Sequence, residues 1–197
     1  MAGARVSEAP ATLVLLRHGE AATGGRCAGQ RLDPPLTRQG RSEAVSARHR
    51  LARGFDAVVS SPAARARQTA RPWTARPSVE PGLAERDFGA WEGRRWEELW
   101  AGVPGEVLTD PAAYAAFTPP GAETLAAVEG RAWAAAERLA VPGRRVLAVT
   151  HAGPLRLVTA RALGLPSAQA FALAAGHGRA VVLRRHGEAW TLEALGA

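Results

Sequence analysis

The sequence contains no lysine, no asparagine and no isoleucine, and it has a single cysteine among its 197 residues. The lone Cys27 excludes an intramolecular disulfide and a cluster of thiolate metal ligands. Because lysine is absent, all 25 basic residues are arginines, and the formal net charge is +7. The arginines are spread along the chain without a long basic run or interleaved aromatic residues, so we expect no nucleic-acid partner.

Long hydrophobic runs are also missing. No stretch approaches the roughly eighteen apolar residues that a membrane-spanning helix needs. Residues 1–10 include Arg5 and Glu8 and lack the apolar core of a secretory signal peptide. We therefore expect a cytoplasmic protein without a membrane partner, in which residues 1–10 are frayed. The length of 197 residues, with 47% hydrophobic and 22% charged residues, fits a single domain over residues 1–197.

Short apolar segments alternate with segments of helical character along most of the chain. Strands are predicted at residues 12–16, 55–59 and 146–150. Helices are predicted from Thr37 to about residue 53, after Ser61, and at residues 122–140 and 154–163. Thr37 and Ser61 are the expected N-caps, and Pro62 is the expected first helical residue after Ser61. This alternation predicts an α/β fold, a three-layer sandwich with a mainly parallel central sheet and helices on both faces.

Two regions depart from this alternation. Residues 181–183 and 190–192 flank Gly187 without a helical pattern after them, which predicts a C-terminal β-hairpin at an edge of the sheet. Residues 91–120 combine tryptophans at nearly helical spacing with a proline-rich stretch, and their pattern allows no clear assignment.

The tetrad Arg-His-Gly-Glu occurs twice. Its first copy, residues 17–20, follows the first predicted strand, whereas its second copy, residues 185–188, lies in the predicted hairpin. In open α/β sheets, ligands bind beyond the carboxyl ends of the parallel strands, where helix N-termini also point. The first copy meets this condition, while turn formation accounts for the second. We therefore expect His18, and not His186, to carry chemistry.

Two more residues share the position of His18 at the carboxyl ends of strands. Arg65 lies in or near the first turn of the helix after the second strand, and His151 follows the strand at residues 146–150. Arginine forks bind phosphate oxygens and stay charged at any working pH. A neutral imidazole between them can attack phosphorus and form a covalent phosphohistidine. No nearby set of acidic and histidine residues has metal-ligand spacing, so we expect no metal and no other cofactor.

With these segments, the chain resembles the histidine phosphatase superfamily, in the branch related to cofactor-dependent phosphoglycerate mutase. The matching segments are residues 16–20, 33–37 with Gly40, 60–70 and 150–153. Between them, residues 83–93 resemble the family segment that carries the catalytic acid, with Glu85 at the acid's position.

The resemblance implies a role for each matching residue. His18 would be the nucleophile, and Glu85 would protonate the leaving alcohol and then help a water to release phosphate. The phosphoryl group would be bound by Arg17, Arg65 and His151. Two neighbouring carboxylates, Asp87 and Glu92, are rival candidates for the acid.

The resemblance also implies a substrate class, a small phosphorylated metabolite that is hydrolysed without a metal. Residues 25–29 resemble loops of α-ribazole phosphatases, which favours α-ribazole 5′-phosphate among the candidates. Ala21 and Gly24 replace a threonine and an asparagine that the family often shows, so some contacts to substrate are missing or supplied elsewhere. In the same loop region, Gln30 is a candidate to face the substrate, and Cys27 is expected to be a small loop residue without a chemical task.

Two alternative functions stay open at this point. One is phosphoryl transfer by a phosphoglycerate mutase-type isomerase, which we disfavour because the chain is short where mutases carry segments that close over the site. The other is a catalytically inactive module that binds phosphorylated ligands. A homodimer is an open alternative for the oligomeric state.

Overall fold

The computed structural model describes residues 9–51 and 54–197. Its centre is a six-stranded sheet with the order β3-β2-β4-β1-β5-β6. The strands are β1 (Ala11–Arg17), β2 (Ala57–Ser60), β3 (Ser78–Val79), β4 (Arg145–Thr150), β5 (Ala180–His186) and β6 (Ala189–Leu195). The first four strands run parallel to one another, whereas β5 pairs antiparallel with β1 and β6 pairs antiparallel with β5. The predicted mainly parallel sheet and C-terminal edge hairpin are therefore confirmed.

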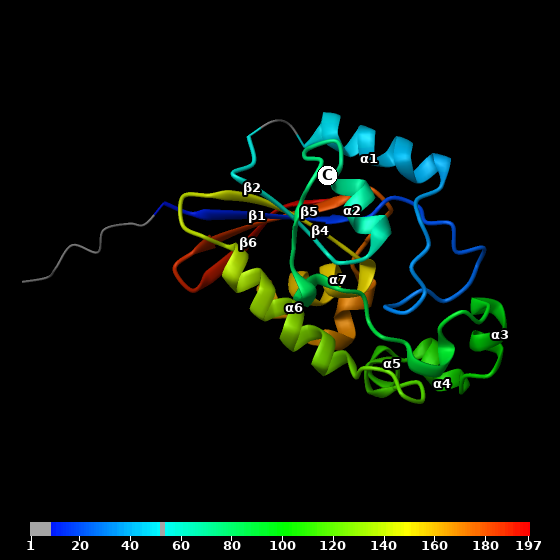
Figure 1. Cartoon of the computed structure of the whole chain (residues 1–197). Helices are drawn as coiled ribbons and strands as arrows, with labels where there is room; N and C mark the ends of the chain where they lie inside the picture. Colours follow the sequence, from blue (N-terminus) through cyan, green and yellow to red (C-terminus); the bar gives the residue numbers. More distant parts are fainter. Residues whose placement is uncertain (1–8, 52–53) are drawn as a thin grey trace, which may run out of the picture.

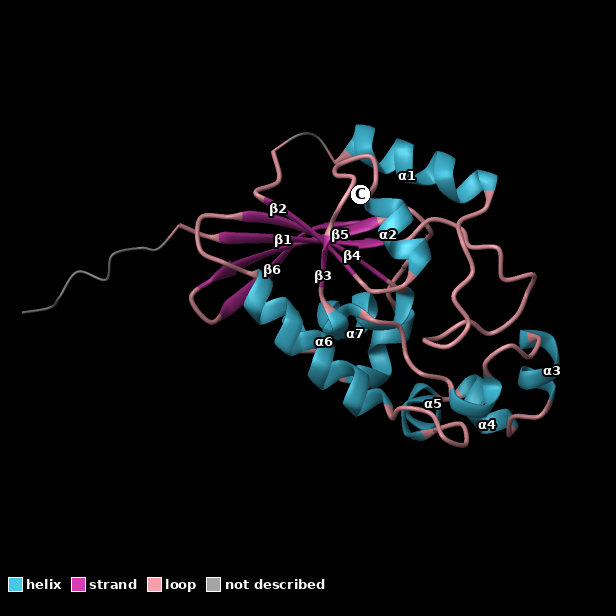
Figure 2. Ribbon diagram, viewed as in Figure 1, coloured by secondary structure: helices cyan, strands magenta, loops and turns pink. Residues whose placement is uncertain are grey.

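Helices cover both faces of this sheet (Figures 1 and 2). The α-helices are α1 (Arg38–Arg50), α2 (Ala64–Ala70), α3 (Trp96–Ala101), α4 (Gly105–Thr109), α5 (Pro111–Ala116), α6 (Leu125–Leu139) and α7 (Ala152–Ala162). Three short 3₁₀ helices are η1 (Pro81–Leu83), η2 (Gly89–Trp91) and η3 (Ser167–Ala172). The helices α1 and α2 lie on one side of the sheet and α6 and α7 on the other, which confirms the three-layer arrangement.

Alternation along β1 explains the two layers of core. Leu13 and Leu15 are fully buried in a cluster with residues of α6 and α7. Val14 and Leu16, which point to the other face, are fully buried in a second cluster with residues of α1 and α2. Burial of each of these side chains contributes about 1.5–3 kcal/mol. The strand that leads to His18 is thus held from both sides.

The ends of the helices differ from the sequence prediction: α6 begins at Leu125 rather than at residue 122, and α7 begins at Ala152 rather than at residue 154. Thr37 does cap α1, since its hydroxyl accepts from the N–H of Gly40 at 2.9 Å. However, α1 ends at Arg50, and the predicted extension to residue 53 runs into residues 52–53, which lie outside the described ranges. Most of the expected fraying at residues 1–10 likewise concerns residues outside them, 1–8.

The start of α2 was predicted wrongly. The helix begins at Ala64, with Ala63 and not Ser61 as its N-cap residue. The physical reason is that the Ser61 hydroxyl is hydrogen-bonded to His151 at 2.7 Å, and the helix starts only after Ala63, whose backbone is extended. The carboxylate of Asp33 accepts the N–H of Ala64 instead, at 2.8 Å, and supplies the missing cap from another loop.

The region at residues 91–120 forms three short helices, α3 to α5, beside the main sandwich (Figure 2). Their apolar residues make a separate aromatic cluster around Trp91, in which Trp96 stacks on Trp100 with ring centroids 5.3 Å apart. Cys27 is buried in the same cluster, as expected for a residue without a chemical task, and burial raises the pKa of its thiol to about 12. The two-residue edge strand β3 was not predicted, because so short a strand carries no periodic signal.

Gly19 and Gly40 lie where the loop after β1 touches the N-terminus of α1. A side chain at either position would collide with backbone atoms of the other segment. A Cβ on Gly40 would lie 2.0 Å from the carbonyl oxygen of Glu20. We expect Gly40→Ala to lower the free energy of unfolding by about 1–3 kcal/mol, because backbone cannot give way as a flexible side chain would. Urea titration followed by circular dichroism measures the change.

The matched control for this prediction is Gly130→Ala. Gly130 lies on the exposed side of α6, and a Cβ there meets nothing within 4 Å. Alanine in an open helical position should raise the free energy of unfolding by about 0.5–1 kcal/mol. Equal effects of the two substitutions would contradict the proposed close contact between the loop and the helix.

Candidate active site

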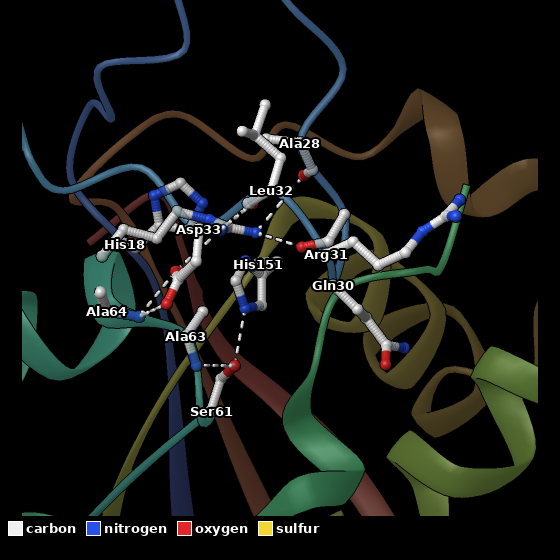
Figure 3. A network of polar contacts seen from close by, with 12 residues as sticks. His18, Ala28, Gln30, Arg31, Leu32, Asp33, Ser61, Ala63, Ala64 and His151 are labelled. Carbon is white, nitrogen blue, oxygen red and sulfur yellow. Dashed lines mark hydrogen bonds and ion pairs between the residues drawn. The ribbon is translucent and has the colours of Figure 1, made fainter. Parts of the chain in front are cut away.

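Polar side chains follow the carboxyl ends of three parallel strands. His18 directly follows β1, Arg65 lies in the first turn of α2 after β2, and His151 follows β4 as the N-cap residue of α7. All three side chains are buried, and the rings of His18 and His151 have centroids 4.9 Å apart. Figure 3 shows the two rings near each other, with Ser61 bonded to His151. The three side chains predicted from the strand ends therefore lie close together.

His186 lies elsewhere. It ends β5, which runs antiparallel to β1, and its neighbour Arg185 is in register with Ala11 at the start of β1. The second tetrad therefore lies near the amino end of β1, at the opposite end of this strand from His18, and includes the exposed turn of the hairpin. Turn geometry accounts for it, since Gly187 has a φ of 59°.

The His18 ring is fixed with one nitrogen available. Its Nδ1 lies 2.7 Å from the carbonyl oxygen of Gly19, which can only accept, so Nδ1 carries the proton and donates. Burial, together with the positive charges of Arg65 and Arg17, lowers the pKa of His18 to about 3. The ring is thus neutral at ordinary pH, and its Nε2 holds a lone pair that can act as a nucleophile.

Arg65 is held by the loop at residues 28–33. Its Nη2 donates to the carbonyl of Gly29 at 2.8 Å, and its Nη1 lies 3.5 Å from the carboxylate of Asp33. The carboxylate of Glu92 organises this loop by accepting the backbone N–H groups of residues 30, 31 and 32 at 2.9, 2.8 and 2.9 Å. Although burial raises the pKa of Glu92, these backbone donors outweigh it and leave the pKa below its usual value. Glu92, a rival for the catalytic acid, is therefore occupied in holding the loop.

Arg17 and His151 each keep one buried nitrogen free. The guanidinium of Arg17 donates from Nη1 to the carbonyl of Ala175 and from Nη2 to His177, at 2.8 Å from the ring Nε2. Its Nε and the Nδ1 of His151 are buried and have no hydrogen-bond partner within the described residues. Burial keeps the pKa of His151 well below its ordinary value, so the ring is neutral. The Nε2 of His151 lies 2.7 Å from the Ser61 hydroxyl, and a hydroxyl that donates there leaves the ring proton on Nδ1.

Glu85 lies at the same site. Its carboxylate accepts the backbone N–H of Arg86 at 2.9 Å and reaches the N–H of Gly153, at the start of α7, at 3.5 Å. Glu85 lines the main pocket together with His18, whereas its rivals Asp87 and Glu92 do not. Gln30, a candidate to face the substrate, instead donates its amide to the backbone carbonyl of Glu85 at 2.9 Å and so braces that segment.

The pocket has a volume of about 600 Å³, which is larger than a phosphate group needs. Besides the charged residues just described, its lining includes other polar residues and a set of aromatic and aliphatic side chains. These are Phe88, Trp96, Tyr114, Leu125, Val128, Leu157 and Phe171. The pocket can therefore hold an organic group attached to a phosphate.

His177 also lines the pocket and was missed by the sequence argument. Its ring lies 5.7 Å from that of His18. It precedes β5 rather than following a strand, but β5 is antiparallel, so its beginning lies beside the end of β1. The available signal would have been a histidine shortly before the strand of a C-terminal hairpin, which is detectable only once the pairing of β5 with β1 is known.

The depressed pKa of His18 predicts how acid affects stability. An unfolded histidine titrates near 6.5, so between that pH and about 3 the unfolded chain binds more protons than the native one. Stability is then lost as the pH falls through this range, with up to ~1.4 kcal/mol per pH unit from His18 alone. We expect His18→Gln to make the fall in unfolding free energy between pH 6.5 and 4.5 shallower, as measured by urea titration. His186→Gln, at an exposed site, should keep the wild-type slope, and equal slopes in all three proteins would contradict the prediction.

Fold and site together define the class of this protein: an α/β sandwich with two histidines and two arginines gathered at the carboxyl ends of its parallel strands. The chain belongs to the histidine phosphatase superfamily, branch 1, whose family model matches residues 13–197. In the described part of the chain, no helix is long and apolar enough to span a bilayer. In the same residues, no three or more metal-binding side chains are grouped so as to hold an ion.

Related proteins of known name agree with this membership. The chain is 37% identical to a bifunctional protein of Mycobacterium tuberculosis, over 78% of its own length but only 44% of the relative's. It is 35% identical to a glucosyl-3-phosphoglycerate phosphatase of Mycolicibacterium vanbaalenii, covering 78% of this chain and 75% of that protein. A metal-independent phosphoserine phosphatase of Arabidopsis thaliana is 34% identical, with coverages of 76% and 67%.

Solved structures are similar over nearly the whole chain. The native mycobacterial glucosyl-3-phosphoglycerate phosphatase superimposes with a TM-score of 0.81 at 30% identity, covering 95% of this chain and 99% of that one. An Escherichia coli protein described as a candidate alpha-ribazole-5′-P phosphatase gives a TM-score of 0.79 at 27% identity, with coverages of 95% and 96%.

Proposed function

We propose that the protein is a metal-independent phosphomonoester hydrolase that works through a phosphohistidine on His18. One observation carries this proposal: within the described residues, a neutral imidazole with a free Nε2 lies near two buried nitrogens that have no hydrogen-bond partner. The unpaired donors are the Nε of Arg17 and the Nδ1 of His151. Buried donors without a partner are costly, and phosphoryl oxygens would satisfy both.

In the first step, the Nε2 of His18 attacks phosphorus and the bond between phosphorus and the alcohol oxygen breaks. Glu85 gives a proton to the departing alcohol. The oxygens of the phosphoryl group are bound by Arg17, Arg65 and His151. Because these donors are already fixed by Ala175, Gly29 and Ser61, they need little reorganisation as charge shifts during the reaction.

In the second step, a water attacks the phosphorus of phosphohistidine. Glu85, now a carboxylate, accepts a proton from this water, the bond between nitrogen and phosphorus breaks, and inorganic phosphate leaves. The Nδ1–H of His18 donates to the carbonyl of Gly19 throughout, so the ring returns to its starting tautomer. Two easier displacements thus replace one difficult displacement.

The proposed substrates are small phosphorylated metabolites in the cytoplasm. Relatives named for their substrates are phosphatases for glucosyl-3-phosphoglycerate and for phosphoserine, and one structural neighbour is described as a candidate for α-ribazole 5′-phosphate. These names favour hydrolysis over a mutase reaction. All three compounds belong in the substrate panel.

The test is release of phosphate from p-nitrophenyl phosphate and from this panel, with a metal chelator present. We expect turnover of p-nitrophenyl phosphate and a preference among the metabolites. A protein that is inert with chelator and active after addition of a divalent metal would contradict the proposal, as would complete inertness on every compound. Phosphate transfer to a second alcohol in preference to water would instead indicate a mutase.

A further inference from the structure

The main pocket carries more positive charge than one phosphate group uses. Two glutamates line it, Glu20 and Glu85, and one of them accepts a hydrogen bond from Thr37. Against these stand five arginines, Arg17, Arg26, Arg65, Arg86 and Arg156. An arginine of this set that has few protein partners can bind a second anionic group of the substrate.

Four of the five arginines already have a role, either at the phosphate end of the pocket or in hydrogen bonds to backbone carbonyls. Arg17 and Arg65 belong to the phosphate end described above. Arg86 donates from Nε to the carbonyl of Glu123 at 2.7 Å and from Nη2 to that of Phe117 at 3.2 Å. Arg26 lies at the exposed rim and donates to the carbonyl of Gly93 at 2.8 Å. Arg86 and Arg26 therefore stabilise the surrounding loops through hydrogen bonds to backbone carbonyls.

Arg156 differs from the other four. It is half-buried on α7, and its Nε donates to the carbonyl of Leu173 at 2.9 Å, which fixes the guanidinium. Within residues 9–51 and 54–197, neither of its Nη atoms has a hydrogen-bond partner and no carboxylate pairs with it. Burial lowers the pKa of Arg17, and the charge of Arg156 lowers it further, so the two guanidinium groups lie within electrostatic reach.

The surroundings of Arg156 strengthen any ion pair formed there. Its guanidinium carbon lies 5.9 Å from the centroid of the Phe171 ring, which packs edge-on against Tyr114 with centroids 4.5 Å apart. Leu125, Val128 and Leu157 also line the pocket, and they form a buried cluster against which Tyr114 and Phe171 pack. An apolar wall excludes water and lowers the local dielectric, so a charge opposite Arg156 is screened less than it would be at the surface.

We propose that Arg156 forms a second anion subsite, which binds a carboxylate or a second phosphate on the alcohol part of the substrate. This inference rests on the proposed phosphomonoesterase function and adds the substrate class: phosphomonoesters that carry another anionic group. The two free Nη atoms suit a planar carboxylate or a phosphate, which a guanidinium binds through two parallel hydrogen bonds. Arg156 is in this sense a residue that determines specificity, not one that performs the chemistry.

The experiment compares matched substrates. 3-Phosphoglycerate and glycerol 3-phosphate differ only in a carboxylate against a hydroxymethyl group, and fructose 1,6-bisphosphate against fructose 6-phosphate tests a second phosphate. We expect wild-type protein to prefer at least one anionic member by about 10- to 100-fold in kcat/KM. Arg156→Met should reduce that preference to about onefold while kcat/KM for p-nitrophenyl phosphate, which has no second anion, stays within about threefold.

Two further variants complete the design. Arg156→Gln also removes the charge but can still donate to Leu173, so it gives the same test if Arg156→Met is poorly folded. Arg144→Met removes an equal charge at an exposed position just before β4, at the end of this strand that lies away from the pocket. This variant should keep the wild-type preference. The pair that shows the preference identifies the anion as carboxylate or phosphate.

Two results would overturn the subsite: a wild-type protein that treats both members of each pair alike, and a preference that survives in Arg156→Gln and Arg156→Met. Inertness of the wild type toward p-nitrophenyl phosphate would instead overturn the underlying phosphatase function. The failures of the two proposals are therefore distinguishable.

Discussion

Replacement of His18 by alanine is expected to abolish phosphomonoester hydrolysis, with kcat/KM lower by ~10⁴-fold or more. The reason is that His18 supplies the only proposed bond to phosphorus, and no second group lies in its place. Its neighbour His151 has its Nε2 bonded to Ser61 at 2.7 Å, and His177 receives a hydrogen bond from Arg17 at 2.8 Å. Neither ring is positioned to take over the attack. Initial rates with p-nitrophenyl phosphate measure the loss.

The control is the second copy of the tetrad. His186→Ala changes an exposed residue of the hairpin, which lies at the opposite end of β1 from His18. This variant should leave kcat/KM unchanged. After quenching with base, which preserves phosphohistidine, labelled phosphate should be found on wild-type protein and on the His186 variant but not on the His18 variant. An inactive His186 variant, or an active His18 variant, would show that the wrong copy was chosen.

The contrast between the two copies shows which information in the sequence was predictive. The tetrad Arg-His-Gly-Glu is the same in both copies, but only the first copy follows a strand that pairs in parallel with a neighbour. Alternation of strands and helices is enough to place His18, Arg65 and His151 at one edge, because carboxyl ends of parallel strands share a side. The distance of 4.9 Å between the two histidine rings is a consequence of this topology.

The parts of the site that could not be predicted depend on long-range pairing. His177 reaches the pocket only because β5 is antiparallel, and direction of pairing is not encoded in the local pattern of residues 180–186. Ser61 has the signature of an N-cap, yet it is drawn to His151, a residue 90 positions away. The loop that holds Arg65 is likewise organised by Glu92, 60 or more positions later. Local propensity decides where elements form, and tertiary contacts decide what the side chains at their ends do.

The role of Glu85 gives the second large effect, and it depends on the leaving group. Glu85→Gln cannot donate a proton to the departing oxygen, so alkyl phosphates, whose alcohols are poor leaving groups, should lose about 10²- to 10⁴-fold in kcat/KM. p-Nitrophenolate leaves without protonation, so its kcat/KM should fall much less. Because kcat/KM reports the steps up to loss of the alcohol, it isolates the acid role from the later activation of water. The measurement is the dependence of log kcat/KM on the pKa of the leaving alcohol over a series of monoesters.

Asp87→Asn is the matched control for Glu85. Asp87 lies two residues away in the same segment, but its carboxylate accepts the backbone N–H of Gly89 at 2.7 Å and it is not among the residues that line the pocket. The Asn variant should keep the shallow leaving-group dependence of the wild type, while Glu85→Gln should make it steep. A uniform loss across the whole series in Glu85→Gln would contradict an acid role and indicate that Glu85 only helps to bind the phosphoryl group. A steep dependence in Asp87→Asn instead would move the acid to the residue that the geometry places outside the pocket.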